Sequence, residues 1–281
     1  MKKHYLANDL VTRLWGLRKW NRLTSVVLRR LRISHLFTIH TSGIELRFYP
    51  AVWNINLWLN PDIFKADTGF LYRYLRPGNT VVDLGANVGL ITLVAAKIVG
   101  NDGVVYSFEP HPKTFGFLQG NIEHTRATNV KSYNIALGNH DGEVTFSNGV
   151  LDDAHHIIFD ETGIQVRVNR LDTILPELLT VHLLKIDVEG FEKFVFEGAP
   201  RILQRTRCIY FESSTALFVR YGYTCADVFF LLKEAGFSLY RLDGPDSVRG
   251  IRDDYVSQEI ENLIAVKDLG EFLWLTGLHI T

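Results

Sequence analysis

From residue 79 onward, short apolar runs alternate with longer segments in which apolar residues recur at helical spacing. The runs are typical of strands buried on both faces, and the amphipathic segments are typical of helices. The expected strands are 80–84, 104–109, 130–135, 182–187, 208–212, 237–242 and 263–267, and the expected helices are 88–99, 113–124, 192–203 and 224–236. This alternation predicts an α/β fold with a mostly parallel sheet and helices on both faces. The last two strands are joined by a polar loop of ~20 residues, which allows an antiparallel pair at the sheet edge.

The first 60 residues follow a different pattern. Between residues 9 and 32, apolar residues at helical spacing are interleaved with Arg and Lys, which predicts one or two basic amphipathic helices. Residues 33–60 hold short apolar runs, and they predict a small strand pair or a lid. We therefore expect a basic N-terminal appendage and lid over residues 1–60 and a main domain over residues 61–281. The basic helices either cap the main domain or contact an anionic membrane surface or an acidic partner.

The composition is that of a globular protein, because 47% of the 281 residues are hydrophobic and 22% are charged. The formal net charge of -1 gives the whole chain no bias toward nucleic acid, although residues 1–32 contain nine Lys or Arg and one acid, Asp9. Cys208 and Cys225 lack metal-ligand spacing, and no apolar run is long enough to span a membrane. We expect a cytoplasmic protein without a metal site, which is membrane-peripheral if residues 1–32 bind lipid.

The first strand of the alternating region ends in a glycine loop, DLGANVG at residues 83–89. In an open α/β sheet, ligands bind beyond the carboxyl ends of the strands, and glycines there permit tight turns and close ligand approach. Dinucleotide-binding loops read GxGxxG, whereas Asp83 precedes the glycines here. An acid in that place would repel a pyrophosphate but would suit an ammonium group. The predicted cofactor contacts in this loop are Asp83, Gly85, Asn87 and Gly89.

A second acid, Glu109, ends the second strand 20 residues after Gly89. An acid in this place can accept hydrogen bonds from both ribose hydroxyls of an adenosine. An ammonium group and an adenosine occur together in S-adenosylmethionine, which we therefore predict as the cofactor. Pro110 directly after Glu109 and Asn134 after the third strand, expected near the adenine ring, extend this predicted site.

Six segments, in this order, resemble the motifs of FkbM-type methyltransferases: 82–89 (VDLGANVG), 108–112 (FEPHP), 136–138 (ALG), 170–174 (RLDTI), 185–190 (KIDVEG) and 197–199 (EGA). The resemblance implies a Rossmann-like, seven-stranded class I methyltransferase sheet, mostly parallel with an antiparallel edge strand, behind the N-terminal helical and strand appendage. It also implies S-adenosylmethionine as methyl donor, and family members commonly methylate hydroxyl groups of sugars or secondary metabolites. The chain departs from the family pattern at residues 151–156 (LDDAHH), where members often carry small residues.

Carboxylates at the ends of the fourth and fifth strands are the candidates for chemistry. Methyl transfer is an in-line displacement, and a hydroxyl nucleophile benefits from a base that removes its proton. Asp187 is predicted to contact the substrate hydroxyl or the cofactor, and Glu189 is predicted to be the general base or to orient it. Glu212 is a candidate contact to the acceptor. Lys185 lies inside an apolar strand and needs a partner, for which Asp172 or another nearby carboxylate is expected.

The loop between two short alternating strands, 143–147 and 164–169, carries His155 and His156. These histidines are candidates to line the acceptor pocket, and a metal site is the alternative that adjacent loop histidines support less well. The leading hypothesis is a methyltransferase acting on a hydroxyl of a small-molecule or glycan acceptor, not on nucleic acid. An N-methyltransferase of a small polar metabolite and a non-catalytic S-adenosylmethionine-binding module are the alternatives.

Overall fold

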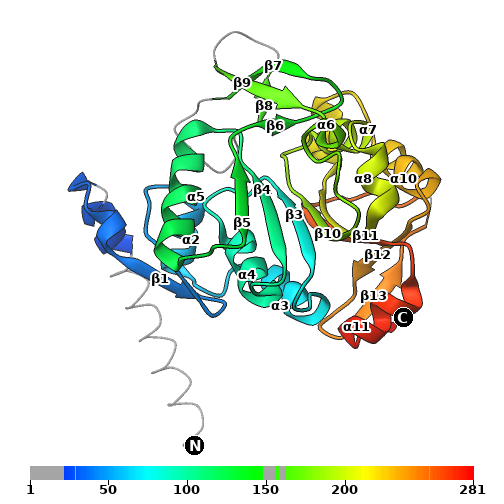
Figure 1. Ribbon diagram of the computed structural model, residues 1–281, viewed down its shortest axis with the longest axis horizontal. Helices are drawn as coiled ribbons and strands as arrows, with labels where there is room; N and C mark the ends of the chain where they lie inside the picture. Colours follow the sequence, from blue (N-terminus) through cyan, green and yellow to red (C-terminus); the bar gives the residue numbers. More distant parts are fainter. Residues whose placement is uncertain (1–21, 29, 148–155, 159–162, 253) are drawn as a thin grey trace, which may run out of the picture.

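A twisted central sheet organises the molecule in the computed structural model, which describes residues 22–28, 30–147, 156–158, 163–252 and 254–281 (Figure 1). Its strands are β3 (Thr80–Leu84), β4 (Val104–Phe108), β5 (Val130–Tyr133), β10 (Val181–Ile186), β11 (Thr206–Ser213), β12 (Ser238–Leu242), β13 (Ser247–Gly250), β14 (Glu261–Val266) and β15 (His279–Ile280). Among the described residues, these nine strands lie in the order β15-β13-β12-β14-β11-β10-β3-β4-β5. Strands β5, β4, β3, β10 and β11 are mutually parallel, whereas β14 is antiparallel to both of its neighbours.

Two layers of helices cover the sheet, because successive apolar residues of each strand face opposite sides. In β3, for example, Val81 packs with the helices of one layer and Val82 with those of the other. The first layer holds α3 (Lys65–Tyr74), α4 (Leu90–Val99), α5 (Pro112–Thr125) and α11 (Leu269–Thr276). The second layer holds α6 (Leu171–Ile174), α7 (Glu192–Glu197), α8 (Pro200–Arg205), α9 (Thr215–Arg220) and α10 (Cys225–Glu234).

A small second sheet lies beyond the carboxyl ends of β4 and β5 (Figure 1). It consists of β6 (Ala136–Leu137), β7 (Gly142–Phe146), β8 (Ile157–Ile158) and β9 (Ile164–Asn169), in the order β6-β9-β7-β8. The two predicted alternating segments form its central antiparallel pair, β7 and β9. The loop that joins them includes His155, which lies outside the described residues.

The N-terminal segment packs onto the first layer of helices. It contains η1 (Ser34–Leu36), the predicted strand pair as β1 (Thr38–Thr41) and β2 (Ile44–Arg47), and α2 (Val52–Leu59), which the apolar pattern did not reveal. The backbone N–H of Arg47 donates to the Asn121 side chain on α5 at 2.8 Å, and Leu46 and Leu57 are completely buried in the same apolar cluster as α4. The strand pair therefore holds this segment against the first layer of helices.

The predicted fold class is confirmed, but three details of the prediction are wrong. The antiparallel strand β14 lies inside the sheet, and β13 and β15 extend the sheet from seven strands to nine. Only one residue of β13, Val248, is apolar, so the alternating pattern could not reveal that strand. The helix expected over 192–203 is interrupted after Glu197, since Pro200 lacks an N–H and starts a new helix. Asp172 completes the break: its carboxylate accepts from the first N–H groups of α8, at 2.9 Å each.

Within the described part of the chain, no helix has the length and apolarity needed to cross a membrane.

Candidate active site

The glycine loop after β3 is a tight left-handed turn. Gly85, Asn87 and Gly89 have φ angles of 78°, 50° and 97°, a region that favours glycine and tolerates asparagine. The N–H groups of Gly85 and Ala86 both donate to the Phe108 carbonyl, at 3.0 and 2.9 Å. A side chain at Gly85 would place its Cβ 1.8 Å from the carbonyl oxygen of Asp187. The loop therefore lies tightly between the ends of β4 and β10, and at Gly85, where it passes the Asp187 carbonyl, there is room for backbone atoms only.

Glu109 is fixed at the end of β4 by backbone hydrogen bonds. Its two carboxylate oxygens accept from the N–H groups of Asn87 at 3.0 Å and His111 at 2.9 Å. Its side chain is buried, and burial raises its pKa to about 7, although the two backbone hydrogen bonds oppose that rise. Asn134 donates to the carbonyls of Glu109 and Pro110, so it shapes the segment that carries the acid.

Lys185 joins the ends of two neighbouring strands. It lies opposite Asp83 in the parallel register of β10 and β3, and its ammonium group is 3.7 Å from Asp83 and 3.3 Å from Asp187. Burial lowers the pKa of Lys185, but the carboxylates of Asp187 and Asp83 outweigh burial and raise it. Of the partners predicted for this lysine, Asp172 is wrong, because that residue serves α8 instead. The alternative, another nearby carboxylate, is confirmed.

The environment of Asp83 favours a supporting role beneath the loop. The side chain is completely buried, accepts a hydrogen bond from Thr92 at 2.6 Å, and is absent from the wall of the neighbouring cavity. Its contact with an ammonium group of the cofactor thus remains a prediction that this geometry does not favour.

Three carboxylates converge beside the loop. Asp187, Glu189 and Glu212 each place an oxygen within 4.8 Å of the others. Glu189 has a φ of 55°, which turns the chain sharply after β10. Burial, followed by the charges of Asp187 and Glu189, raises the pKa of Glu212 to about 10. Behind them, Glu192 is completely buried, and burial raises its pKa to about 7. The site therefore brings several acidic side chains together. At neutral pH Glu212 is protonated and Glu192 is partly protonated.

A cavity that opens to solvent lies between the loop and the small sheet, and its space together with the solvent at its mouth is about 720 Å³. Six of the predicted site residues line it: Gly85, Asn87, Glu109, Pro110, Asp187 and Glu189. Gly89, Asn134, Glu212 and His156 do not line it. A carboxylate oxygen of Glu212 lies within 4.8 Å of oxygens of the lining residues Asp187 and Glu189, and His156 precedes the lining residue Ile157. The expected roles of these residues, and of His155, remain predictions.

The apolar wall of the cavity escaped the sequence analysis. Phe146 and Ile157 come from the small sheet, and Phe191 follows the KIDVEG segment directly. Trp53 comes from α2, where it stacks on Phe64 with ring centroids 4.1 Å apart. Proximity to the KIDVEG segment could have identified Phe191, but no sequence signal connects Trp53 to a loop that begins 30 residues later.

Comparisons with known proteins match this chain to one family model and to several methyltransferases. The family model described as the methyltransferase FkbM domain matches residues 83–239, more than half of the chain. A protein of Beauveria bassiana named Methyltransferase 1 is 32% identical over 143 residues, covering 42% of this chain and 57% of that protein. The catalytic subunit of a tRNA (adenine(58)-N(1))-methyltransferase from Yarrowia lipolytica is 30% identical over 84 residues, covering 29% of this chain and 22% of that protein. Both matches span less than two thirds of the relative.

Similar solved structures include a methyltransferase FkbM from Methylobacillus flagellatus, at 14% identity and a TM-score of 0.43, covering 75% of this chain and 52% of that one. A precorrin-6y C5,15-methyltransferase from Geobacter metallireducens has the same identity and TM-score, covering 72% of this chain and 89% of that one.

Proposed function

The chain belongs to the FkbM family of S-adenosylmethionine-dependent methyltransferases, and on this premise we propose that it O-methylates a hydroxyl group of a sugar, a glycan or a secondary metabolite. The observation that carries the proposal is the group of three carboxylates, Asp187, Glu189 and Glu212, beside the loop cavity. A hydroxyl must lose its proton as it attacks a methyl group, and a carboxylate beside the point of attack can take that proton.

The residues around the cavity fit S-adenosylmethionine. Gly85 leaves the narrowest part of the loop free of side chains, and Glu109 keeps a further lone pair on each oxygen for a ribose hydroxyl. The apolar residues Phe108, Ile135 and Leu137 line the same cavity and would flank an adenine ring. When bound, S-adenosylmethionine supplies a methyl group on a sulfonium, whose leaving group is neutral.

The three carboxyl groups beside the cavity have different proposed roles toward the acceptor hydroxyl. Glu189 lines the cavity and accepts the proton of the acceptor hydroxyl. Asp187 is held by Lys185 at 3.3 Å, so it orients the hydroxyl rather than taking its proton. Glu212, with its raised pKa, keeps a proton at neutral pH and can donate a hydrogen bond within the cluster. His155 and His156 remain candidate contacts to the acceptor.

Aromatic side chains complete the pocket. Trp53, Phe146 and Phe191 line the side of the cavity that faces the N-terminal segment and the small sheet. Such walls exclude water and hold the acceptor in line with the methyl group, and positioning supplies much of the acceleration in a displacement of this kind.

The same carboxylates also support a second candidate, N-methylation of a small polar metabolite. An amine is a cation before it reacts, and the acidic side chains that converge beside the cavity would attract it. A non-catalytic module that only binds the cofactor is the third candidate, although it needs neither Glu189 nor Glu212.

The three candidates are separated by one experiment. The purified chain is incubated with methyl-labelled S-adenosylmethionine and sets of sugars, glycans, secondary metabolites and amines, and the bond formed is assigned by NMR. We expect O-methyl ethers. The Glu189→Gln variant should keep the cofactor affinity, measured by calorimetry, but lose turnover by about 10²-fold or more. Glu109→Ala should weaken cofactor binding instead.

Glu143→Gln, on the exposed face of β7, is the matched control and should change neither quantity. Full turnover in the Glu189→Gln variant would show that Glu189 is not the general base. N-methyl products would establish the second candidate, and cofactor binding without any transfer would leave the third.

A further inference from the structure

The N-terminal helical segment turns apolar side chains outward. Residues 22–28 and 30 are helical, and at about 100° per residue Arg22, Leu23, Val26, Val27 and Arg30 fall on one arc of about 140°. All five are exposed, with Leu23 at 59%. A helix that simply covers a protein surface places such leucines and valines inward.

The opposite arc is the one that packs on the protein. It carries Thr24, Ser25 and Leu28: Ser25 is buried, and Leu28 packs on the apolar cluster of the first helical layer. The N–H of Ile33 donates to the Leu28 carbonyl at 3.0 Å, which fixes the turn after the helix. Because the inward face is already seated, the outward apolar face is left for something else.

Exposed apolar residues continue past the helix. Leu31 is 61% exposed, Leu36 on η1 is 70% exposed, and Phe37 is also exposed. Arg22 and the exposed Ile63 line one open groove between this segment and the C-terminal part of α2 with the residues after it. Isolated exposed apolar residues are common, but a contiguous group with arginines among them marks an interaction surface.

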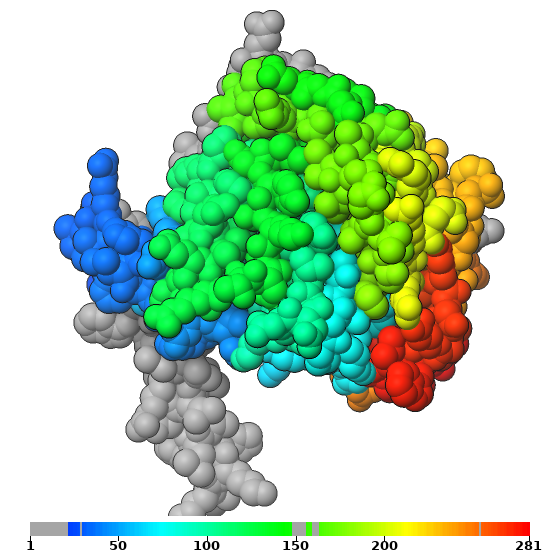
Figure 2. All heavy atoms as spheres, viewed as in Figure 1, coloured from blue at the N-terminus to red at the C-terminus, as the bar shows by residue number. Residues whose placement is uncertain are grey.

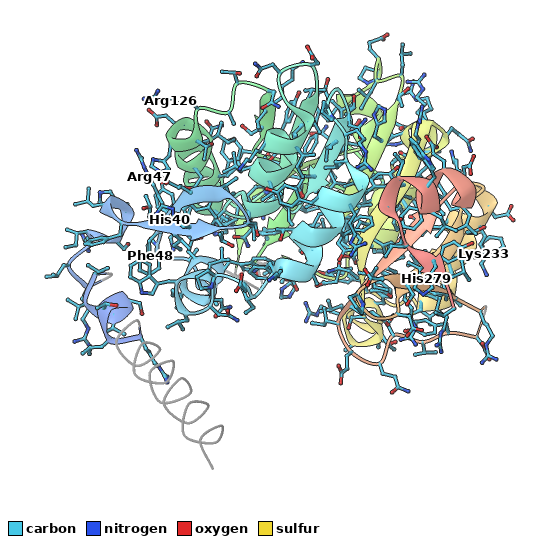
Figure 3. All side chains as sticks on the ribbon, turned by 90° about the horizontal axis from the view of Figure 1, so that it is seen from below. His40, Arg47, Phe48, Arg126, Lys233 and His279 are labelled. Carbon is cyan, nitrogen blue, oxygen red and sulfur yellow. The ribbon has the colours of Figure 1, made fainter. Side chains whose placement is uncertain are left out.

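Together, the exposed apolar and arginine residues of this segment form a surface that we call the N-terminal face: Arg22, Leu23, Val26, Val27, Arg30, Leu31, Arg32, Leu36 and Phe37. It stands at the margin of the molecule in Figure 2, and in Figure 3 it lies beyond the hairpin marked by His40 and Arg47.

Charge separates the candidate occupants of this face. Between residues 10 and 44 the sequence contains seven Lys or Arg and no Asp or Glu. A second copy of the same face would bring arginines against arginines, which is unfavourable. An anionic lipid surface can bind both the arginines and the apolar side chains of this face. Its headgroups attract the arginines, and leucine, valine and phenylalanine can insert at the boundary with the acyl chains.

We propose that the N-terminal face docks the protein on the surface of a membrane that contains anionic lipid. The face binds in the plane of the interface and does not span the bilayer. Trp53 on α2 connects this docking segment to the active-site cavity, because α2 follows the hairpin directly and Trp53 lines the cavity. Docking does not depend on which acceptor the enzyme methylates.

The test is flotation of the full chain with lipid vesicles. Vesicles of phosphatidylcholine alone are compared with vesicles that also contain phosphatidylserine, at low and at raised salt. We expect binding to the anionic vesicles that falls with salt. Arg30→Gln and Arg32→Gln should each lower the partition coefficient about fivefold. Leu23→Ser combined with Val27→Ser should lower it at least about tenfold.

Trp274→Ser is the matched control, because Trp274 is 81% exposed on α11 at the opposite end of the molecule. This control should float like the unaltered protein. The substituted side chains are exposed, so thermal unfolding of each variant should match that of the unaltered protein.

Three outcomes overturn the proposal. They are no binding to either kind of vesicle, equal binding to both kinds, and loss of binding in Trp274→Ser to the same extent as in the variants of the N-terminal face. Self-association in light scattering that the Leu23 and Val27 substitutions abolish, without vesicle binding, would assign the face to a second copy of the chain instead.

Discussion

Replacing Glu192 by glutamine should stabilise the protein at alkaline pH and leave it unchanged at acidic pH. Glu192 is completely buried at the start of α7. One of its oxygens accepts from the N–H groups of Val188 at 3.1 Å and Gly190 at 3.4 Å, and the other has no hydrogen-bond partner among the described residues. Glutamine keeps the accepting oxygen and removes the charge, with an NH2 group in place of the second oxygen.

The magnitude follows from the pKa of Glu192. Burial raises it from an ordinary value of 4.5 to about 7, so the folded protein binds this proton more tightly than the unfolded chain does. Stability therefore falls as the pH rises from about 4.5 to about 7, and it stays lower above that range. At about 1.4 kcal/mol for each pKa unit, the charged side chain costs roughly 2–3 kcal/mol at pH 8.5 relative to pH 5. The Glu192→Gln variant escapes that loss.

The assay is urea unfolding followed by tryptophan fluorescence at about pH 5 and about pH 8.5. The difference in unfolding free energy between variant and parent should be near zero at the lower pH and roughly 2–3 kcal/mol in favour of the variant at the higher pH. Glu109 titrates in both proteins, whereas the charge of Glu192 also raises the pKa of Glu212, so the neutral variant relieves that group in the same direction. Glu234→Gln, exposed at the end of α10, is the control that should show no such difference.

Glu192→Ala separates charge from hydrogen bonding, because alanine leaves the N–H groups of Val188 and Gly190 without their acceptor. It should destabilise the protein at both pH values by about 1–3 kcal/mol. The reasoning is refuted if Glu192→Gln is as destabilising at pH 8.5 as at pH 5, since the ionised carboxylate would then be stabilised by its surroundings.

Further substitutions test the geometry of the glycine loop and of the start of α8. Gly85→Ala should cost more than about 3 kcal/mol and weaken cofactor binding, since its Cβ would meet the carbonyl of Asp187 at 1.8 Å. Gly78→Ala, with a φ of 82° but nothing within 4 Å, should lose only about 1 kcal/mol, and equal losses at the two glycines would show that the clash is relieved. Asp172→Ala removes the acceptor for two N–H groups at the start of α8 and should lower the unfolding free energy by about 1–2 kcal/mol, while Asp172→Asn should recover part of that loss. Calorimetric unfolding that leaves Asp172→Ala at the parent Tm would rule out this capping role.

The sheet and the cofactor side of the site could be predicted because local patterns determine them. The glycine loop must turn at the end of a buried strand, and Glu109 must end the next strand, so their proximity follows from the parallel order. Even the helix break after Glu197 was visible in Pro200. The apolar pattern alone predicts one helix, because apolar residues continue at helical spacing across the break.

The acceptor side could not be predicted, because it is assembled from segments far apart in the sequence. Trp53 reaches the cavity from α2, a helix with no distinct polar face, and Phe146 reaches it from a small sheet whose strands are very short. The supporting role of Asp83 also depends on the register between β3 and β10, which sets Lys185 beside it. Neither register nor inserted elements are encoded in a single motif.

The pairing of Lys185 bears on which carboxylate acts as the base. The lysine is shared between Asp83 and Asp187, so the charge of Asp187 is engaged before any acceptor arrives. Glu212 has a pKa of about 10, because burial and the neighbouring carboxylates oppose its ionisation, and it already holds a proton at neutral pH. A group that already holds a proton cannot accept another. Glu189 lines the cavity, so it stays our proposed acceptor for the proton of the substrate hydroxyl.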